Sequence, residues 1–366
     1  MKAWKGSTKN RIRLAGLVLL LCSLVYAAGC AGGGGESDAD RITVTDCLGR
    51  QVAIPANPER IAAVDPFAGQ AVIMFGGGDK ILDASGGVQR DLLLQEMCPA
   101  LKDAVTMSGG DPNIEELLRL EIDLLFIKDE AYSNKQLVEK LENAGIPFLV
   151  MAYDDMAAQM TAAKVVGEAL GQPGEAELYQ EYYQKAIDRA GAIATLVPQE
   201  KQQRLYHSVN EAVRTDPAGS LGMDWIAVTG AANVAAGANL ESSGSAAYST
   251  LEQIYIWNPD LIICNESGVA DYILTDAKWS GLKAVREKSV YQIPIGVSRW
   301  GHPNSTETPL AILWLTKLLY PEEGAEINME AEVSYFYQTF FDYAPTNEVI
   351  QRIYSGEGIR ASGTGS

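Results

Sequence analysis

The sequence contains only two histidines, His207 and His302, in 366 residues. It has no HExxH motif and no CxxC pair, so the zinc sites that those spacings build are not predicted. No serine has glycine both two positions before it and two positions after it, which excludes the G-x-S-x-G elbow of many hydrolases. Residues 76–80, GGGDK, lack the GK[ST] ending of a phosphate-binding loop and predict a turn at a helix end. These absences leave no positive indication of an enzyme.

Basic residues are also scarce, with 29 Lys and Arg against 47 Asp and Glu, which gives a net charge of −18. An acidic surface repels phosphate backbones, so no nucleic-acid partner is expected. Cysteine is rare as well, and only Cys47, Cys98 and Cys264 lie outside the first 30 residues. Cys47 and Cys98 are able to pair in an oxidising compartment, whereas Cys264 lies in an apolar stretch and is expected to be a packed thiol.

The first 40 residues predict an export signal followed by a lipid anchor. Five Lys and Arg precede an apolar run at residues 14–28, and small residues stand directly before Cys30. This pattern is typical of a signal peptide at residues 1–29, with Cys30 as the lipidated N-terminus. The Gly-rich residues 30–40 then form a flexible tether. The alternative, an uncleaved transmembrane anchor, requires a longer apolar run. We therefore expect an extracytoplasmic lipoprotein attached to the cell membrane.

From residue 41 onwards, apolar stretches of strand length alternate with amphipathic helical patterns. Such alternation is typical of α/β lobes with mostly parallel sheets. We predict an N-terminal lobe at residues 41–172, a C-terminal lobe at 200–354 and a flexible tail at 355–366. The predicted strands are at residues 60–64, 81–84, 122–127, 146–151, 204–209, 260–264 and 290–293.

A long helical segment separates the two predicted lobes. The pattern predicts one helix at residues 156–170, a break at 171–174 and a second helix at 175–196. At 1.5 Å per residue the second helix would be about 30 Å long, which is close to the diameter of a small domain. We therefore expect residues 173–199 to form a single stiff linker helix.

The two halves of the chain share a short repeat. Asn113-Ile114-Glu115 is followed by the stretch DLLFI at residues 123–127, and Thr250-Leu251-Glu252 is followed at the same interval by DLIIC at residues 260–264. Each unit predicts a short helix with a glutamate in its first turn and then a buried strand. A duplicated βα architecture explains the repeat, and chance similarity of two short units is the alternative.

From about Ile42 to Glu322 the chain resembles the periplasmic binding proteins that serve ABC importers of iron–siderophore, haem and cobalamin compounds. The resemblance is carried by the order of ITVTDCLGRQVAIPANPERIAAVDP, PNIEELLRLEIDLLFI, YSTLEQIYIWNPDLIIC, WSGLKAVREKSVYQIP and ETPLAILWLTKLLYPE. It implies two α/β lobes joined by one rigid helix, with the ligand in the cleft between them. It also implies a receptor, expected to be a monomer without cofactor or catalytic residues, that delivers its ligand to a permease with its ATPase.

In the family that the chain resembles, one glutamate on each lobe docks onto arginines of the permease. By motif position these are Glu115 and Glu252, and two exposed carboxylates on a rigid body suit two basic pockets. The alternative role is helix capping, because residues 249–252 have the spacing of a capping box and Glu115 lies in a first helical turn.

In an α/β lobe, ligands bind beyond the carboxyl ends of the strands, and that rule selects a set of loops. The loop at residues 298–305 is the strongest candidate, because it contains Arg299, Trp300 and His302 and precedes a predicted helix at 307–319. Trp300 would stack on a flat ligand face, Arg299 would pair with a carboxylate or catecholate, and His302 is a possible metal ligand. Core packing of Trp300 and solvation of Arg299 are the alternatives. Further cleft candidates are Asp65, Phe67, Met107, Tyr132, Tyr153, Arg214 and Tyr272.

These residues do not fix the ligand. Trp300 and His302 suit haem or cobalamin, whereas Arg299 beside a helix N-terminus suits an anionic siderophore or an oxyanion such as molybdate or tungstate. By analogy with the family we expect an iron–siderophore or a related metal chelate. Haem, cobalamin or an oxyanion is the alternative, and a surface-anchored enzyme or an adhesive lipoprotein is the alternative from another class. His207 lies in a predicted strand and is expected to be a hydrogen-bonded strand residue.

Overall fold

The computed structural model describes residues 40–107, 111–244 and 246–356. All of them belong to one compact unit. The predicted signal peptide at 1–29, the lipidation site Cys30 and the tether up to residue 39 lie outside the described residues. In the described part of the chain, no helix is both long enough and apolar enough to cross a membrane.

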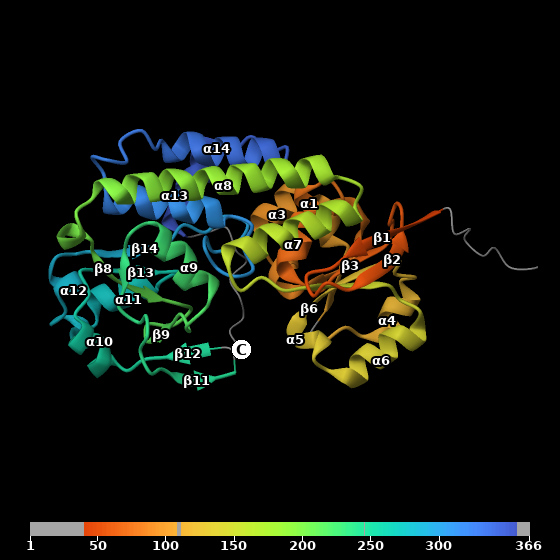
Figure 1. The fold of residues 1–366 in the computed structure, drawn as a ribbon, viewed down its shortest axis with the longest axis horizontal. Coiled ribbons are helices and arrows are strands. Elements are labelled where there is room, and N and C mark those ends of the chain that lie inside the picture. The colour runs from red at the N-terminus through yellow and green to blue at the C-terminus, as the bar shows by residue number, and fades with distance from the viewer. Residues whose placement is uncertain (1–39, 108–110, 245, 357–366) are drawn as a thin grey trace, which may run out of the picture. The chain divides into compact units, whose positions relative to one another are not determined.

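The N-terminal lobe is built on a five-stranded parallel sheet with the strand order β5-β4-β3-β6-β7 (Figure 1). An antiparallel hairpin of β1 and β2 precedes it. The strands are β1 Arg41–Thr45, β2 Gln51–Pro55, β3 Ile61–Ala63, β4 Ile81–Ser85, β5 Val105–Met107, β6 Leu124–Lys128 and β7 Phe148–Met151. The helices are α1 Pro66–Met74, α2 Gly86–Gln89, α3 Leu92–Met97, α4 Ile114–Arg119, α5 Asp129–Tyr132, α6 Lys135–Ala144 and α7 Met156–Ala169.

Both faces of this sheet are buried, because successive strand residues alternate between two apolar clusters. Leu125 and Ile127 of β6 pack with Leu117 of α4 and with the apolar side of α6. Leu124 and Phe126 of the same strand pack in the other cluster, with residues of α1 and α7. This period-2 alternation explains why the strand is apolar without interruption, as is usual for parallel sheets.

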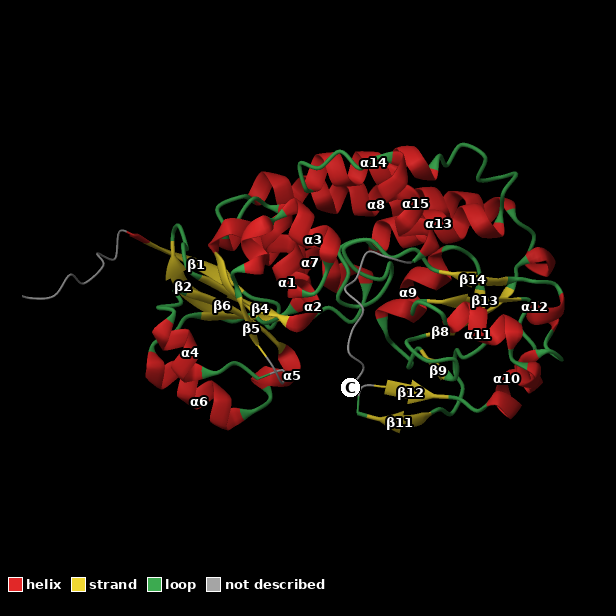
Figure 2. Ribbon diagram, turned by 180° about the vertical axis from the view of Figure 1, so that it is seen from behind, coloured by secondary structure: helices red, strands yellow, loops and turns green. Residues whose placement is uncertain are grey.

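The C-terminal lobe contains a four-stranded parallel sheet in the order β10-β8-β13-β14 and a small antiparallel sheet in the order β11-β12-β9 (Figure 2). Its strands are β8 Arg204–Ser208, β9 Arg214–Thr215, β10 Ala232–Asn233, β11 Glu241–Ser243, β12 Ala246–Tyr248, β13 Leu261–Cys264 and β14 Val290–Gln292. Its helices are α9 Leu221–Val228, α10 Leu251–Trp257, α11 Val269–Thr275 and α12 Lys283–Arg286. The predicted fold class, two α/β lobes with mostly parallel sheets, is confirmed.

The repeat seen in the sequence is also a repeat of structure. Asp123, directly before β6, accepts a hydrogen bond from the backbone N–H of Arg60 at 3.0 Å. Asp260, directly before β13, accepts one from the backbone N–H of Arg204 at 2.8 Å. The residues two positions before these aspartates both adopt the left-handed conformation, with φ of 50° and 42°. In each lobe, an aspartate at the equivalent position therefore holds the starts of two neighbouring strands together.

The long helix α8, Pro173–Leu196, agrees with the predicted linker helix. It packs along α7 and along α13, Thr308–Leu319, which belongs to the C-terminal half of the chain. Tyr179 and Tyr183 of α8 are fully buried in an apolar cluster that draws residues from both lobes. The linker is thus held on the body of the protein rather than standing free between the lobes. The boundaries 41–172, 173–199 and 200–354 remain predictions.

The chain ends in two further helices, α14 Met329–Phe340 and α15 Asn347–Ser355. The flexible tail predicted from residue 355 therefore begins too early, because Ser355 is the last residue of α15 and Gly356 caps that helix. Residues 357–366 lie outside the described part of the chain.

The three cysteines of the described chain are free thiols. The possible disulfide between Cys47 and Cys98 is therefore not formed. Cys98 packs against the backbone of Gly78, where an added Cβ would lie 2.7 Å from its sulfur. Cys264 is a buried strand residue, as predicted, and burial raises its pKa to about 12.

Candidate functional site

A cavity of about 630 Å³ lies where the carboxyl ends of the two parallel sheets face each other. Its walls include Lys128 at the end of β6, Tyr153 after β7 and Asn210 after β8. The loop at residues 299–304 closes it from the C-terminal half of the chain. Four of the predicted cleft residues line this cavity, namely Tyr153, Arg214, Arg299 and His302.

The wall from the N-terminal lobe is organised around the hydroxyl of Tyr153. This hydroxyl donates to Oδ2 of Asp65 at 2.5 Å and lies 3.2 Å from Oδ1 of Asn304. Nζ of Lys128 donates to the same Asn304 oxygen at 2.9 Å and lies 5.6 Å from the centre of the Tyr153 ring. Burial raises the pKa of Asp65, and the nearby Lys128 partly offsets that effect. Asp65 itself is fully buried, so it positions Tyr153 and does not line the cavity.

The wall from the C-terminal lobe is organised around Arg299, whose side chain is only 10% exposed. Its guanidinium donates to Oε2 of Glu266 at 2.6 Å and to the side chain of Asn210. Nη2 of Arg299 lies 3.3 Å from Nε2 of His302. Two acceptors from two different loops therefore fix the direction of this cation at the edge of the cavity.

The loop that carries Arg299 is clamped by residues of the N-terminal lobe. Nε2 of Gln159 donates to the carbonyl oxygens of Pro303 and Ser305 at 3.1 and 3.0 Å. Nε2 of Gln70 donates to the carbonyl oxygen of Asn304 at 2.8 Å. These bonds connect residues more than 140 positions apart and fix the floor of the cavity across both lobes. These two glutamines, Lys128 and Asn304 were not among the site residues predicted from the sequence.

Charge is divided between the two walls of the cavity. The N-terminal lobe contributes three carboxylates and one cation, and the C-terminal lobe two cations and one carboxylate, namely Asp129, Glu130, Asp154 and Lys128 on one side and Arg214, Arg299 and Asp216 on the other. Burial and the neighbouring Glu130 raise the pKa of Asp129 to about 6. The basic wall can bind carboxylate, catecholate or other anionic oxygens of a ligand.

The other histidine, His207, is a buried strand residue, as predicted from its position. Its Nδ1 lies 2.8 Å from Oδ2 of Asp216, so the ring is held by a carboxylate at the back of the cavity. Oδ1 of Asp216 lies against Gly222 in the first turn of α9, so close that any Cβ at that position would clash.

Trp300 does not line the cavity, and the prediction that it stacks on a ligand is wrong. Its side chain is completely buried. Nε1 of Trp300 donates to Oε1 of Glu307 at 3.0 Å, and the ring packs edge-on against Tyr354 with a centroid distance of 6.2 Å. Trp300 therefore closes the core, which was the alternative role.

Glu307 is a fully buried carboxyl group that holds the base of this loop. It accepts from the backbone N–H of Ser298 at 2.9 Å, from the indole of Trp300 and from the hydroxyl of Tyr337. Burial raises the pKa of Glu307 to about 7, although these three donors oppose the shift. The folded state therefore binds a proton between pH 4.5 and pH 7 that the unfolded chain has released.

This titration predicts how stability changes with pH. A raised carboxyl pKa contributes stability below pH 4.5 that is lost as the pH rises through about 7. Between pH 5 and pH 7.5 we expect Glu307 to lower the free energy of unfolding by about 2 kcal/mol. Urea unfolding of the wild type and of Glu307→Gln at both pH values measures this, because the amide does not titrate. Equal pH dependence of the two proteins would contradict the assignment.

Three other predicted cleft residues do not line the cavity. Phe67 is fully buried and packs against the Tyr153 ring at 5.0 Å, so it supports the cavity wall from behind. Tyr132 packs against Phe148 and the guanidinium of Arg50. Tyr272 is exposed on α11 beside Trp279. Met107 ends β5, and its side chain lies outside what the structure describes.

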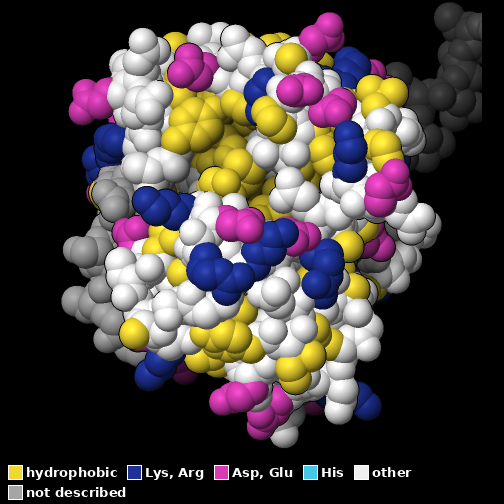
Figure 3. Space-filling view, turned by 90° about the vertical axis from the view of Figure 1, so that its left-hand side faces the viewer, with side chains coloured by type: hydrophobic (Ala, Val, Ile, Leu, Met, Phe, Trp, Pro, Cys, Tyr) yellow, Lys and Arg dark blue, Asp and Glu magenta, His cyan; other side chains and the backbone are white. Residues whose placement is uncertain are grey.

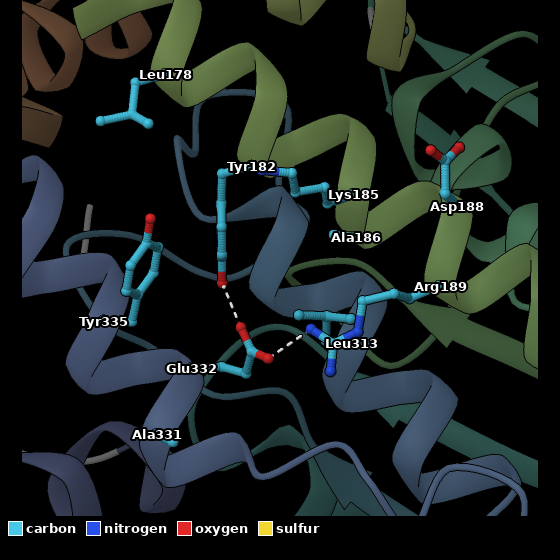
Figure 4. Close-up of a pocket in the computed structure, with 10 residues that line it drawn as sticks. All are labelled: Leu178, Tyr182, Lys185, Ala186, Asp188, Arg189, Leu313, Ala331, Glu332 and Tyr335. Carbon is cyan, nitrogen blue, oxygen red and sulfur yellow. Dashed lines mark hydrogen bonds and ion pairs between the residues drawn. The ribbon is translucent and has the colours of Figure 1, made fainter.

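A second cavity, of about 510 Å³, lies between α8, α13 and α14 (Figure 4). Its lining is mainly apolar, and its best placed polar groups are already bonded to each other. Glu332 accepts from the hydroxyl of Tyr182 at 3.1 Å and from Nη1 of Arg189 at 2.5 Å. The groove's carboxylate and guanidinium are thus paired with each other, so it is a weaker candidate for a solute.

Glu115 and Glu252 are both exposed and both occupy the second position of a short helix. The caps are other residues, since Asn113 caps α4 and Thr250 caps α10. Thr250 accepts from the backbone N–H of Gln253, so Gln253 and not Glu252 stands at the third helical position. The capping box predicted at residues 249–252 is therefore wrong in register, and neither glutamate side chain is needed as a cap.

The fold and the cavity define a binding protein for a small solute. The family model for periplasmic binding proteins matches residues 61–295, and the chain belongs to that family. It is 24% identical to the molybdate-binding protein MolA of Haemophilus influenzae, over 84% of this chain and 93% of that protein. It is 22% identical to the uncharacterized ABC transporter substrate-binding lipoprotein YvrC of Bacillus subtilis, over 84% of this chain and 97% of that protein.

Solved structures agree with this assignment. A periplasmic solute-binding protein from Veillonella parvula has a TM-score of 0.73 and 25% identity, covering 86% of this chain and 97% of that one. The protein is thus a solute-binding component of an ABC importer, a class that works outside the cytoplasmic membrane with a cognate permease. The related proteins are named as binding proteins.

Proposed function

We propose that the protein captures an anionic metal chelate of the ferric-siderophore class and delivers it to its permease. The observation that carries this proposal is the basic wall of the cavity, where Arg299 is fixed by Glu266 and Asn210 and is joined by His302 and Arg214. Fixed guanidinium groups suit catecholate and carboxylate oxygens, which are the donors of such chelates. A volume of about 630 Å³ falls in the range of sites for drug-sized ligands.

The chemistry of the lining supports a preformed chelate over a bare metal ion or a flat macrocycle. In the described part of the chain, no three His, Cys, Asp or Glu side chains are close enough together to hold a metal. Among the described residues, His302 is the single imidazole on the cavity wall. It would add one ligand to a metal that a chelator already holds, and it would not bind a bare metal ion by itself. In the part of the lining that the structure describes, Tyr153 is the one Phe, Tyr or Trp, which leaves little surface for stacking a haem or a corrin.

A metal oxyanion is the second candidate, because a relative is named as a molybdate-binding protein and α9 begins at the cavity. A helix N-terminus binds anions well. In this chain, however, the carboxylate of Asp216 already lies against the first turn of α9 at Gly222. A second anion placed there would be repelled, so this feature favours the larger chelate.

We also propose that the receptor is a monomeric lipoprotein, anchored through Cys30 to the outer side of the cell membrane. The support is the sequence pattern of residues 1–40 and the lipoprotein named among its relatives. Incorporation of radiolabelled palmitate into the wild type, and its absence in Cys30→Ser, tests the anchor.

A thermal-shift panel tests the ligand class. The panel contains ferric catecholate and ferric hydroxamate siderophores, haemin, cobalamin, molybdate and tungstate. A ligand at one hundred times its Kd stabilises the folded state by about 2.7 kcal/mol, which is easily measured. Stabilisation by a ferric siderophore alone supports the proposal. A response only to an oxyanion, haemin or cobalamin, or no response to any compound, would refute it.

Arg214 offers a milder test of the basic wall. It is half-buried in β9 and reaches the cavity. Arg214→Ala is expected to weaken binding of the anionic chelate about tenfold, which is the scale of one charge-assisted hydrogen bond. Titration calorimetry at two salt concentrations measures this loss and its salt dependence. Arg204→Ala, an exposed arginine at the start of β8 outside the cavity, is the matched control, and an equal effect of both variants would contradict the role of Arg214.

A further inference from the structure

Arg299 and His302, two cavity residues of the C-terminal lobe, stand at the two ends of one tight turn. The backbone N–H of His302 donates to the carbonyl oxygen of Arg299 at 3.1 Å. Gly301, the third residue of the turn, has a φ of 71°, a conformation that favours glycine. Nη2 of Arg299 and Nε2 of His302 lie 3.3 Å apart. The direction of both groups in the cavity therefore depends on how this turn is held.

A tryptophan from outside the loop holds the turn at its third residue. Trp225 of α9 is fully buried, and its Nε1 donates to the carbonyl oxygen of Gly301 at 3.0 Å. The ring also packs on Gly301, where an added Cβ would lie 2.6 Å from a ring atom. Another edge contact, to His207 at a centroid distance of 5.9 Å, fixes the ring from β8. Trp225 thus holds the turn by a hydrogen bond and by direct packing.

The helix that carries Trp225 is also bonded to the N-terminal lobe. Oδ2 of Asp224 accepts from the backbone N–H of Met156 at 2.9 Å. Met156 is the first residue of α7 and stands three residues after Tyr153, which belongs to the opposite wall of the cavity. Gly222 in the first turn of α9 lines the cavity itself. Figures 1 and 2 both place α9 on the side of its lobe that faces the N-terminal lobe. Helix α9 therefore links the two walls.

We propose that Trp225 is a positioning residue for ligand capture, which holds Arg299 and His302 in the direction that binds the anionic chelate. Trp225 does not line the cavity, so it acts through the turn and not by touching the ligand. The inference rests on the proposed function and adds to it a residue that sets the affinity from behind the cavity wall.

The physical reason is preorganisation. A turn that is fixed before the ligand arrives loses little conformational entropy when the ligand binds. Trp225→Phe keeps an aromatic ring against Gly301 but removes the N–H that holds its carbonyl oxygen. The turn then adopts several directions in the free protein, and the ligand must order it again.

Titration calorimetry with a ferric tris-catecholate siderophore measures the effect on binding. Trp225→Phe is expected to weaken binding about fivefold, which is the scale of one hydrogen bond. The same substitution in an Arg299→Ala background should weaken binding less than twofold, because the turn then no longer carries the guanidinium. Such non-additivity identifies an effect that passes through Arg299, and a general loss of stability does not produce it.

Trp279→Phe is the matched control. Trp279 is also buried in the C-terminal lobe, but it belongs to another apolar cluster than Trp225. It precedes α12 by four residues. Figure 1 places α12 away from α9, at the end of the molecule that Figure 3 views and where a band of Lys and Arg side chains crosses the surface. Trp279→Phe should lower stability and leave the Kd within twofold of the wild type.

Hydrogen exchange of the ligand-free protein tests the turn itself. A peptide that covers residues 299–305 is expected to exchange about fivefold faster in Trp225→Phe, because the bond between His302 and Arg299 opens more often. The same peptide should exchange at the wild-type rate in Trp279→Phe. A peptide that covers β13 should be unchanged in Trp225→Phe, which shows that the lobe is still folded.

The outcomes separate this inference from the function on which it rests. Unchanged exchange at the turn in Trp225→Phe would refute the inference, whatever the ligand is. Equal weakening by Trp225→Phe with and without Arg299, or by Trp279→Phe, would refute it as well. If the exchange changes as expected and the wild type does not bind the siderophore, the proposed ligand class fails and the role of Trp225 in holding the turn stands.

Discussion

Arg299→Ala is expected to weaken binding of the anionic chelate about a hundredfold. The guanidinium is almost completely buried and is aimed by Glu266 and Asn210, so its loss removes the best fixed cation of the cavity. It also leaves Glu266 without its ion pair close to the bound anion. Truncation of one member of such a pair costs about 2–5 kcal/mol, which corresponds to at least a thirtyfold change in Kd.

Titration calorimetry with the ferric siderophore measures this effect. Arg299→Lys keeps the charge but loses the fork of donors, so it should recover only part of the affinity. Arg286→Ala, an arginine of α12 outside the cavity, should bind like the wild type. A Kd for Arg299→Ala within threefold of the wild type would mean that the ligand does not contact the basic wall.

Trp300→Ala is expected to destabilise the protein by about 3–5 kcal/mol, the usual cost of truncating a buried tryptophan. The indole is fully buried, and its loss opens a void beside Tyr354 and removes one of the three donors to Glu307. A buried carboxyl group that loses a donor adds its own desolvation cost. Urea unfolding at pH 7 measures the change.

Trp300→Phe separates packing from hydrogen bonding. It keeps most of the ring volume but lacks the indole N–H, so a loss of about 1–2 kcal/mol is expected. Both variants should bind the siderophore with an affinity within tenfold of the wild type, because Trp300 does not reach the cavity. Normal stability combined with lost binding would instead identify Trp300 as a ligand contact.

The secondary structure and the repeat were predictable because they depend on local patterns. Strand β6 is apolar at every position that the sheet buries, and α6 has the amphipathic spacing of a surface helix. The aspartates before β6 and β13 recur at one interval because each pins a neighbouring strand. Such regularities are visible in the chain itself.

The cavity was only partly predictable. The rule that ligands bind beyond parallel strands selected loops that line the cavity, and with them Tyr153, Arg214, Arg299 and His302. That rule does not determine which side chains of a loop point into the cavity. Trp300 was misjudged because its neighbour Tyr354 and Tyr337, which donates to the same Glu307 carboxyl group, belong to helices that the loop meets only in the folded chain.

The residues that the sequence missed share the same cause. Gln70 and Gln159 contact the loop at residues 303–306 across more than 140 positions of sequence. No local sequence motif identifies a glutamine whose side chain donates a hydrogen bond to a distant carbonyl oxygen. The prediction of the capping box was wrong for a different reason. The residue that caps α10 is Thr250, one position after the predicted Ser249.

The most direct test of the account is the position of the metal in a crystal of the protein grown with a ferric siderophore. The account predicts an anomalous iron peak inside the cavity between Tyr153 and Arg299, with anionic ligand oxygens within hydrogen-bond distance of the Arg299 guanidinium. An iron peak in the groove between α8 and α14, or on the protein surface, would contradict it.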